Sequence, residues 1–298
     1  MEAPDKANLS ERTIDSCPVS VGLIQMAMTD DFAKNREKAA LLIRRAATQG
    51  AQIICLPELF TTLYFANEER ASRDWTEEVP GETGAMLSSL ARELGTVIVG
   101  GSVYERGEGG KNFNTSLVYD ADGRLLGKYR KMHIPHDPSF FEQHYFERGD
   151  LGYRVFDTRF GRVAVLICYD QWFPEAARAA ALAGAQIIYY PTAIGTVQGI
   201  EQREGNWQEA WENVQRGHAI ANNVVVCAVN RVGTEGESRF WGGSFACDAF
   251  GRTLARAGNE EEVVVTTVDF GHSEFVREGW RFFYNRRPET YGKLQEME

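Results

Sequence analysis

Short runs of apolar and β-branched residues recur along the chain, and few of them alternate with polar residues. Uninterrupted runs of this length are typical of strands that are covered on both faces. The runs lie at 19–24, 51–56, 96–99, 163–167, 185–190, 224–229 and 263–268. The pattern therefore predicts sheets that have helices or other sheets on both sides.

Stretches with helical periodicity separate several of these predicted strands, at 31–48, 84–94, 174–183 and 207–221. Pro174 suits the first position of its helix, where no N–H donor is needed. Alternating strands and helices are typical of an α/β fold. Two further stretches turn around Gly123 and Gly251 and predict hairpins at 116–128 and 244–255, so the sheets should be mixed.

One short motif occurs twice. The sequence Gly-Ala-Gln-Ile-Ile, with proline three residues further on, starts at Gly50 and again at Gly184. In each copy a predicted helix passes through glycine into a buried strand. The repeat indicates either two similar halves or a chance match, and both interpretations stay open. A length of 298 residues fits about two domains of roughly 150 residues, but no linker rich in Pro, Gly or Ser separates the halves.

Composition and charge argue against several classes of partner. The net charge is −10, and the 32 lysines and arginines form no strong cluster, which argues against binding to nucleic acid or to an anionic membrane. Residues 1–17 are polar and carry acids, so we expect a disordered arm rather than a signal peptide. No apolar run approaches the roughly 20 residues of a membrane span. The sequence thus predicts a soluble, cytoplasmic protein.

The five cysteines are scattered without a Cys-x-x-Cys pair, which fits a reducing compartment. Cys55 and Cys227 fall inside predicted strands and should be core residues; Cys17 lies in the arm, and the place of Cys247 stays open. Cys168 lies between a predicted strand and a predicted helix. Ligands bind at the carboxyl ends of strands in such sheets, and a turn there places backbone N–H groups beside a nucleophile. Cys168 is therefore either a nucleophile or a small buried side chain.

Two further residues could act with a thiol at this position. Glu58 directly follows a strand of the first half and either caps a turn or serves as a general base. Transfer of a thiol proton to a carboxylate is unfavourable by about 4 pKa units at the reference values, so we expect a nearby ammonium to lower the pKa of Cys168. Lys131, just beyond the first hairpin, could supply it, although a lysine in a basic loop is usually solvated.

Other chemistries have weaker support. Cys168 could pair with His218 or His133 as in a cysteine–histidine hydrolase, and His133, His136 and His144 could bind a metal only if one loop supplied every ligand. Neither alternative accounts for the glutamate and the lysine. No phosphate loop of the Gly-x-x-x-x-Gly-Lys type occurs. We therefore expect an enzyme for a small molecule that needs no cofactor and no metal.

The segments 56–58, 129–133 and 167–170 together resemble the nitrilase superfamily of Glu-Lys-Cys carbon–nitrogen hydrolases. The resemblance runs from about residue 19 to the tail. It implies a single domain over 18–298, folded as a four-layer α-β-β-α sandwich with two mixed sheets. It also implies that Cys168 is the nucleophile, that Glu58 is the base and that Lys131 stabilises the oxyanion. Glu142 matches a second glutamate of the family and would orient Lys131 and the substrate amide.

Within the superfamily, the segments 168–178 and 190–195 resemble the branch that hydrolyses N-carbamoylputrescine. Relatives that act on N-carbamoyl amino acids tend to carry arginine just after the nucleophile, which suits a carboxylate. Gln171 and Trp172 stand there instead, and an aromatic wall suits an alkyl chain that ends in a cation. The expected substrate-binding residues are Tyr64, Tyr169, Trp172 and Thr192. The acidic residues Glu201, Glu204, Glu209 and Glu212 either supply a counter-charge or form a solvated helix face.

The resemblance implies hydrolysis of a ureido group to putrescine, ammonia and carbon dioxide, a step of polyamine biosynthesis. Two alternatives stay open: hydrolysis of an N-carbamoyl amino acid such as β-ureidopropionate or of an ω-amide, and, from another class, a non-catalytic binding protein. The tail at 275–298 mixes aromatic residues with arginines, which are favoured at interfaces. We therefore expect a homodimer or a larger symmetric assembly.

Overall fold

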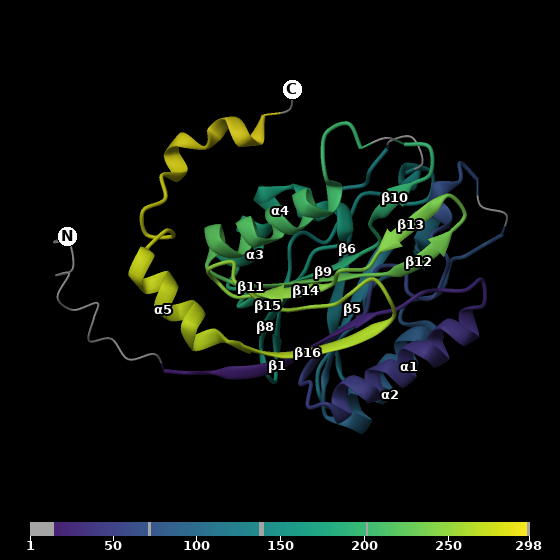
Figure 1. Cartoon of the computed structure of the whole chain (residues 1–298), viewed down its shortest axis with the longest axis horizontal. Coiled ribbons are helices and arrows are strands. Elements are labelled where there is room, and N and C mark those ends of the chain that lie inside the picture. Colours follow the sequence, from purple (N-terminus) through teal and green to yellow (C-terminus); the bar gives the residue numbers. More distant parts are fainter. Residues whose placement is uncertain (1–14, 71–72, 137–139, 201, 297–298) are drawn as a thin grey trace.

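The structure is a computed structural model and describes residues 15–70, 73–136, 140–200 and 202–296. Two large mixed sheets lie face to face (Figure 1). The first sheet has the order β16 (Glu262–Asp269), β1 (Pro18–Gln25), β2 (Ile53–Cys55), β3 (Val97–Val99), β5 (Asn112–Tyr119) and β4 (Val103–Arg106), with β6 (Leu125–Arg130) also paired to β5. The second has the order β15 (Thr253–Arg256), β14 (Phe245–Cys247), β11 (Val225–Asn230), β9 (Ile187–Thr192), β8 (Gly161–Val165) and β7 (Val155–Thr158).

Helices cover the outer faces of both sheets. Helices α1 (Phe32–Thr48) and α2 (Gly81–Leu94) lie on the first sheet, and α3 (Pro174–Leu182) and α4 (Trp207–Asn222) lie on the second (Figure 1). The predicted four-layer sandwich is therefore confirmed. Helix α5 (Phe270–Trp280) begins the C-terminal segment, and short 3₁₀ helices lie at Phe65–Asn67, Glu108–Gly110, Glu142–His144, Cys168–Trp172, Pro288–Thr290 and Gly292–Gln295.

Alternation along each strand assigns its side chains to a layer, because successive side chains point to opposite faces. In β2, Ile53 and Cys55 belong to the core between the two sheets, which also contains Val165 of β8. Ile54 points the other way and packs in the cluster that includes Ile43 of α1. All of these side chains are fully buried. Burial on both faces explains why the strand runs are apolar without interruption.

The two Gly-Ala-Gln-Ile-Ile segments occupy equivalent places. Each leads from a helix into the central strand of three parallel ones, β1-β2-β3 in the first sheet and β8-β9-β11 in the second. The first strand of each trio also pairs with an antiparallel strand, β1 with β16 and β8 with β7. The arrangement favours the interpretation as two similar halves over a chance match.

The predicted strands, helices and hairpins all occur, with ends shifted by a few residues. A third sheet was not predicted; its strands are β10 (Gly195–Val197), β13 (Ser238–Trp241) and β12 (Val232–Glu235). These strands have three or four residues of mixed polarity, so no apolar run marks them. Helix α5 was missed as well, because its buried face is narrow and the helix contains two glycines.

The ends and the surface bear on the predicted partners. Of the expected arm, residues 1–14 lie outside the described residues, whereas the Ser16 hydroxyl and the Cys17 N–H both donate to Asp269 at 2.8 Å. Cys55 and Cys227 are buried, as predicted, and Cys247 is buried too.

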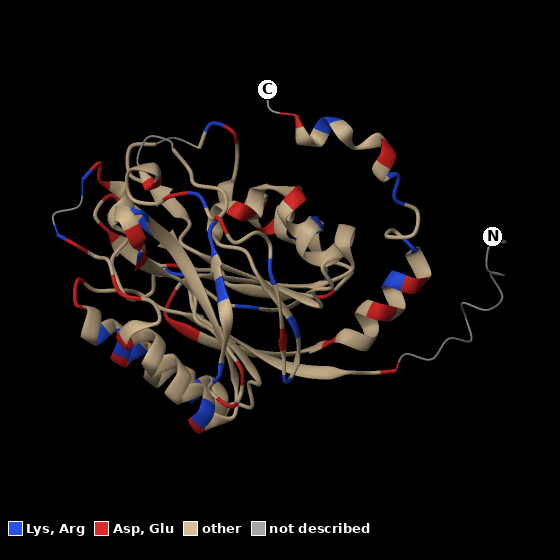
Figure 2. Ribbon diagram, turned by 180° about the vertical axis from the view of Figure 1, so that it is seen from behind, with Lys and Arg blue, Asp and Glu red and all other residues tan. Residues whose placement is uncertain are grey.

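Figure 2 shows acidic and basic residues interleaved along α1 and α5. Within the described ranges, no helix is long and apolar enough to cross a membrane.

Candidate active site

Cys168 lies on a tight turn between β8 and α3. Its φ of +42° is in the left-handed region, which costs free energy for a residue other than glycine and is typical of functional turns. A 3₁₀ helix starts at Cys168, and α3 begins at Pro174. The predicted sequence of strand, turn and helix is confirmed. The turn places the Sγ atom 3.9 Å from the carbonyl oxygen of Ala193, which follows β9.

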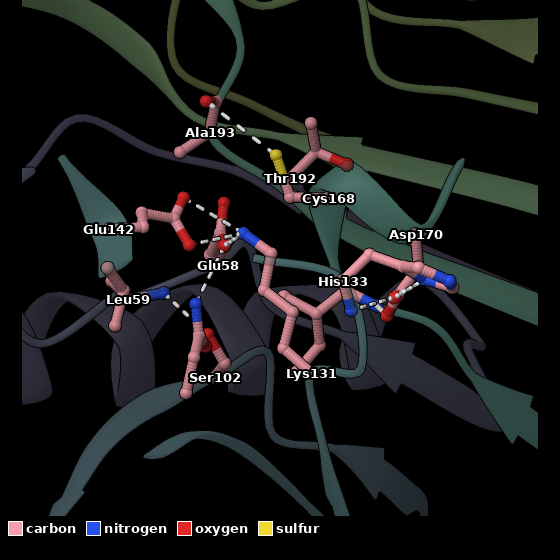
Figure 3. Close-up of polar contacts among 12 residues, drawn as sticks. Glu58, Leu59, Ser102, Lys131, His133, Glu142, Cys168, Asp170, Thr192 and Ala193 are labelled. Carbon is pink, nitrogen blue, oxygen red and sulfur yellow. Dashed lines mark hydrogen bonds and ion pairs between the residues drawn. The ribbon is translucent and has the colours of Figure 1, made fainter. Parts of the chain in front are cut away.

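Lys131 follows β6 and is fully buried, unlike a typical lysine of a basic loop. Its Nζ lies 2.9 Å from Oε1 of Glu58 and 2.6 Å from Oε2 of Glu142. The hydroxyl of Tyr64 donates to the other oxygen of Glu142 at 2.8 Å. Figure 3 shows both carboxylates meeting at the Lys131 ammonium, close to the sulfur of Cys168. The fold thus brings together all four residues that the sequence singled out for catalysis.

The two oxygens of Glu58 have different surroundings. Oε1 accepts hydrogen bonds from Lys131 and, at 2.8 Å, from the side-chain amide of Asn114. Oε2 is buried and has no hydrogen-bond partner among the described residues. Other buried side-chain atoms also lack a partner, but this one belongs to a carboxylate that acts electrostatically on the Cys168 thiol. Oε2 is therefore free to accept a proton.

The turn that carries Glu58 is held by a residue of the second half. Arg231, just after β11, is fully buried, and its Nη2 donates to the backbone oxygens of Glu58 and Leu59 at 2.8 and 3.0 Å. Its Nη1 pairs with Glu235 at 2.8 Å. Sequence reasoning did not find Arg231; its one signal was a charged residue directly after a buried strand.

Mutual charges and burial set the proton affinities of the cluster. Burial alone would lower the pKa of Lys131, but Glu142 and Glu58 outweigh it and hold that pKa above its usual range. Burial raises the pKa of Glu142 to about 7, with a further rise from Glu58 and an opposing effect of Lys131. Two carboxylates share one ammonium here, so Glu142 tends to keep its proton.

We expected a nearby ammonium to lower the pKa of Cys168. For the overall shift of that pKa this expectation is wrong. Burial raises the pKa of this thiol well above its usual value, and the negative charge of Glu58 raises it further. Lys131 does act in the expected direction, but it is outweighed. The resting cysteine is therefore a neutral thiol, and it would need a base to take its proton before it could act as a nucleophile.

The histidines have other partners. Nδ1 of His133 lies 2.7 Å from the carboxylate of Asp170, and Nε2 of His218 lies 2.7 Å from the backbone oxygen of Gln171. The ionisable groups that change the pKa of Cys168 are instead Glu58, Lys131 and Glu142. This arrangement favours the glutamate–lysine interpretation over a cysteine–histidine pair. In the described part of the chain, no group of three or more His, Cys, Asp or Glu is placed to hold a metal.

A cavity of about 260 Å³ opens above Cys168. Its lining is mainly apolar and aromatic, and it includes three of the predicted substrate-binding residues: Tyr64, Tyr169 and Trp172. The fourth, Thr192, is fully buried and is not part of the described lining; its hydroxyl donates to the backbone oxygen of Tyr190 at 2.9 Å. The lining residues not found from the sequence include Phe140, Ile194 and Trp207.

The acidic residues considered as a counter-charge do not line the described part of this cavity. Glu212 pairs with Arg216 and Arg256, and Glu204 accepts from the indole N–H of Trp207 at 3.1 Å. Glu209 is exposed on α4, and Glu201 lies outside the described residues. For the residues that can be placed, a solvated helix face is the better interpretation.

A four-layer fold with a buried cluster of glutamate, lysine and cysteine below a small cavity defines an enzyme that hydrolyses carbon–nitrogen bonds. The chain belongs to the carbon-nitrogen hydrolase family, whose profile matches residues 20–278. It is 39% identical over 294 residues to the N-carbamoylputrescine amidase of Solanum lycopersicum, covering 94% of this chain and 96% of that protein. It is 36% identical to the citrullinase of Francisella tularensis, covering 93% and 98%.

A solved structure agrees with this assignment. The crystal structure of a carbon-nitrogen hydrolase from Helicobacter pylori G27 matches with a TM-score of 0.89 at 37% identity. The match covers 94% of this chain and 99% of that one. The nitrilase-like fold and the class of reaction are therefore established together.

Proposed function

We propose that the protein hydrolyses the ureido group of N-carbamoylputrescine through a covalent intermediate on Cys168. The observation that carries this proposal is the free, buried Oε2 of Glu58 beside a neutral thiol, with Lys131 fixed between Glu58 and Glu142. A base, a nucleophile and a cation thus share one buried site, where electrostatic stabilisation of a transition state is strongest.

In the first half of the reaction, Sγ of Cys168 attacks the ureido carbon while its proton passes to Glu58. The negative charge that develops on the ureido oxygen is stabilised by Lys131 and by the backbone N–H of Tyr169, each donor contributing about 2.7–4 kcal/mol. The C–N bond then breaks, and Glu58 returns the proton to the leaving nitrogen. Water, deprotonated by Glu58, attacks the thioester-like intermediate in the second half. The nitrogen that leaves in the first half is the terminal one, which departs as ammonia. Hydrolysis of the intermediate frees the Cys168 thiol and the carbamic acid of putrescine, which then splits into putrescine and carbon dioxide.

The cavity supports a substrate with an alkyl chain and a distal cation. No arginine or lysine occurs among the described residues of its lining, so a substrate carboxylate would find no bidentate partner there. The faces of Trp172 and Trp207 suit a methylene chain and attract an ammonium. The relatives named an N-carbamoylputrescine amidase and a citrullinase also support a ureido substrate.

A side-by-side assay of ammonia release tests the proposal. The panel is N-carbamoylputrescine, citrulline, N-carbamoyl-β-alanine and a simple ω-amide, each with the parent enzyme and with Cys168→Ser. We expect the highest kcat/KM for N-carbamoylputrescine and nearly no turnover by the folded serine variant. A higher kcat/KM for a carboxylate-bearing substrate would reject the substrate assignment, and substantial activity of Cys168→Ser would reject the mechanism.

We also propose that the chain self-associates through its C-terminal segment. Trp280, Tyr284 and Leu294 are more than half exposed, and the segment runs along the outside of the molecule next to α3 and α4 (Figure 1). Aromatic side chains exposed in this way are favoured in interfaces. Light scattering at micromolar concentration should give at least twice the mass of the chain; a stable monomer would reject this proposal.

A further inference from the structure

Asp170, two residues after Cys168, is fully buried and accepts four hydrogen bonds. Its Oδ1 accepts from the backbone N–H of His133 at 3.0 Å and lies 2.7 Å from the Nδ1 of the same residue. Its Oδ2 accepts from the hydroxyl of Tyr129 at 2.7 Å and from the backbone N–H of Ile167 at 2.9 Å. The carboxylate thus joins two segments that are far apart in the sequence.

The positions of these donors relative to the reacting groups are specific. Lys131 lies between Tyr129 and His133, so Asp170 holds the chain on both sides of this lysine. Ile167 directly precedes Cys168, so the same carboxylate also holds the start of the nucleophile turn. Figure 3 shows Asp170 and His133 next to Lys131, on the side away from Glu142.

The two side-chain donors are themselves restrained. The ring of His133 stacks on Phe173 with a centroid distance of 3.6 Å and an interplanar angle of 6°. Burial, together with Asp170, raises the pKa of Tyr129 well above its usual value, so its hydroxyl keeps the proton that it donates. Four well-placed donors on one buried carboxylate make a rigid connection, since every alternative leaves a buried polar group unpaired.

We propose that Asp170 is a positioning residue that sets the place of the Lys131 ammonium relative to the Cys168 sulfur. Glu58 and Glu142 fix the ammonium itself, and Asp170 fixes the backbone on both sides of Lys131 to the turn that carries Cys168. Misplacement of a catalytic group by about 1 Å can cost about 100-fold in rate. The inference rests on the proposed function of Lys131 and Cys168.

The test is Asp170→Asn, which keeps the shape but turns one acceptor into a donor that faces existing donors. Asp248→Asn is a matched control, because Asp248 is also largely buried and accepts from the N–H groups of Phe250 and Arg252 and from the Arg252 side chain in the β14–β15 turn. We expect kcat to fall about 100-fold in Asp170→Asn with KM within threefold of the parent. Both constants should stay within twofold in Asp248→Asn.

A second readout does not need a substrate. Lys131 lowers the pKa of the Cys168 thiol, so its displacement should slow alkylation by iodoacetamide. We expect at least a threefold lower rate at pH 8 in Asp170→Asn and no change in Asp248→Asn. The rate is followed by mass spectrometry of the Cys168 peptide, because Cys17 is exposed and also reacts.

The outcomes distinguish the positioning role of Asp170 from the proposed function of the enzyme. A folded Asp170→Asn with kcat and alkylation within twofold of the control would overturn the positioning role. A parent enzyme that hydrolyses none of the panel would reject the proposed function, while the alkylation comparison would still decide the role of Asp170. If Asp170→Asn does not fold, Tyr129→Phe, which removes one donor of the four, takes its place with an expected fivefold to tenfold loss of kcat; an unchanged kcat in that variant would overturn the inference.

Discussion

The guanidinium of Arg231 donates a 2.8 Å hydrogen bond to the backbone oxygen of Glu58, across the boundary between the two halves of the chain. Its partner Glu235 accepts from the backbone N–H of Tyr64 at 2.6 Å, and the Tyr64 hydroxyl reaches Glu142. A single buried ion pair of the second half therefore supports both carboxylates that hold Lys131.

Arg231→Met, compared with the double variant that adds Glu235→Gln, should show that stability and activity depend on Arg231 for different reasons. It leaves Glu235 buried and unpaired, so we expect a loss of about 3–5 kcal/mol in the free energy of unfolding and a large fall in kcat. Adding Glu235→Gln removes the unpaired charge and should restore part of the stability but not the activity. Denaturant unfolding and kcat of both variants check this prediction. Arg44→Met, at an exposed ion pair with Glu93, is the control and should change both quantities little.

Glu58→Gln should slow both halves of the reaction, because the amide cannot take the thiol proton or activate water. We expect kcat to fall by about 10²–10⁴-fold with a cooperatively folded protein. Single-turnover kinetics, with intact-mass measurement of any adduct on Cys168, show which half is slower. Kinetics equal to those of the parent would rule out Glu58 as the base.

The stability of the protein should depend on pH through Glu142. Burial raises its pKa to about 7 in the folded state, above the value of 4.5 expected when unfolded. The folded protein thus binds the Glu142 proton more tightly than the unfolded chain does. The resulting contribution to the free energy of unfolding is complete below about pH 4.5 and is lost as pH rises through about 7. The difference between the folded and unfolded pKa values of Glu142 corresponds to at most about 3 kcal/mol in the free energy of unfolding. Unfolding at pH 5 and pH 8 should show a smaller loss in Glu142→Gln than in the parent; equal losses would contradict the prediction.

Trp172→Ala should raise KM for N-carbamoylputrescine more than it lowers kcat. The indole lines the cavity and is 36% exposed, so its loss removes a wall and a cation–π contact worth about 0.5–2 kcal/mol, or about 2- to 30-fold in KM. Trp280→Ala, at a tryptophan that is 56% exposed on α5, is the matched control. Initial-rate kinetics with both variants decide it, and a KM that rises equally in both would count against a role in substrate binding.

Much of the fold follows from local pattern. Runs such as 53–56 and 187–190 are apolar on both faces, and this alone predicts strands covered on both sides. The short strands of the third sheet lack any such signal, because their pairing is decided by partners elsewhere in the chain. The placement of Cys168 on a turn was likewise readable, since a strand, a thiol and Pro174 follow one another directly.

The sequence by itself determined the α/β class, the turn of Cys168 and, through resemblance, the four residues of the cluster. Only the tertiary structure decided their chemistry. Lys131 is a buried ammonium rather than a solvated one because Glu58 and Glu142 reach it from other segments. The pKa of Cys168 is raised because burial outweighs the nearby ammonium, a balance that depends on distances. Arg231 and Asp170 emerged only from the structure, because each acts through contacts between segments that lie far apart in the sequence.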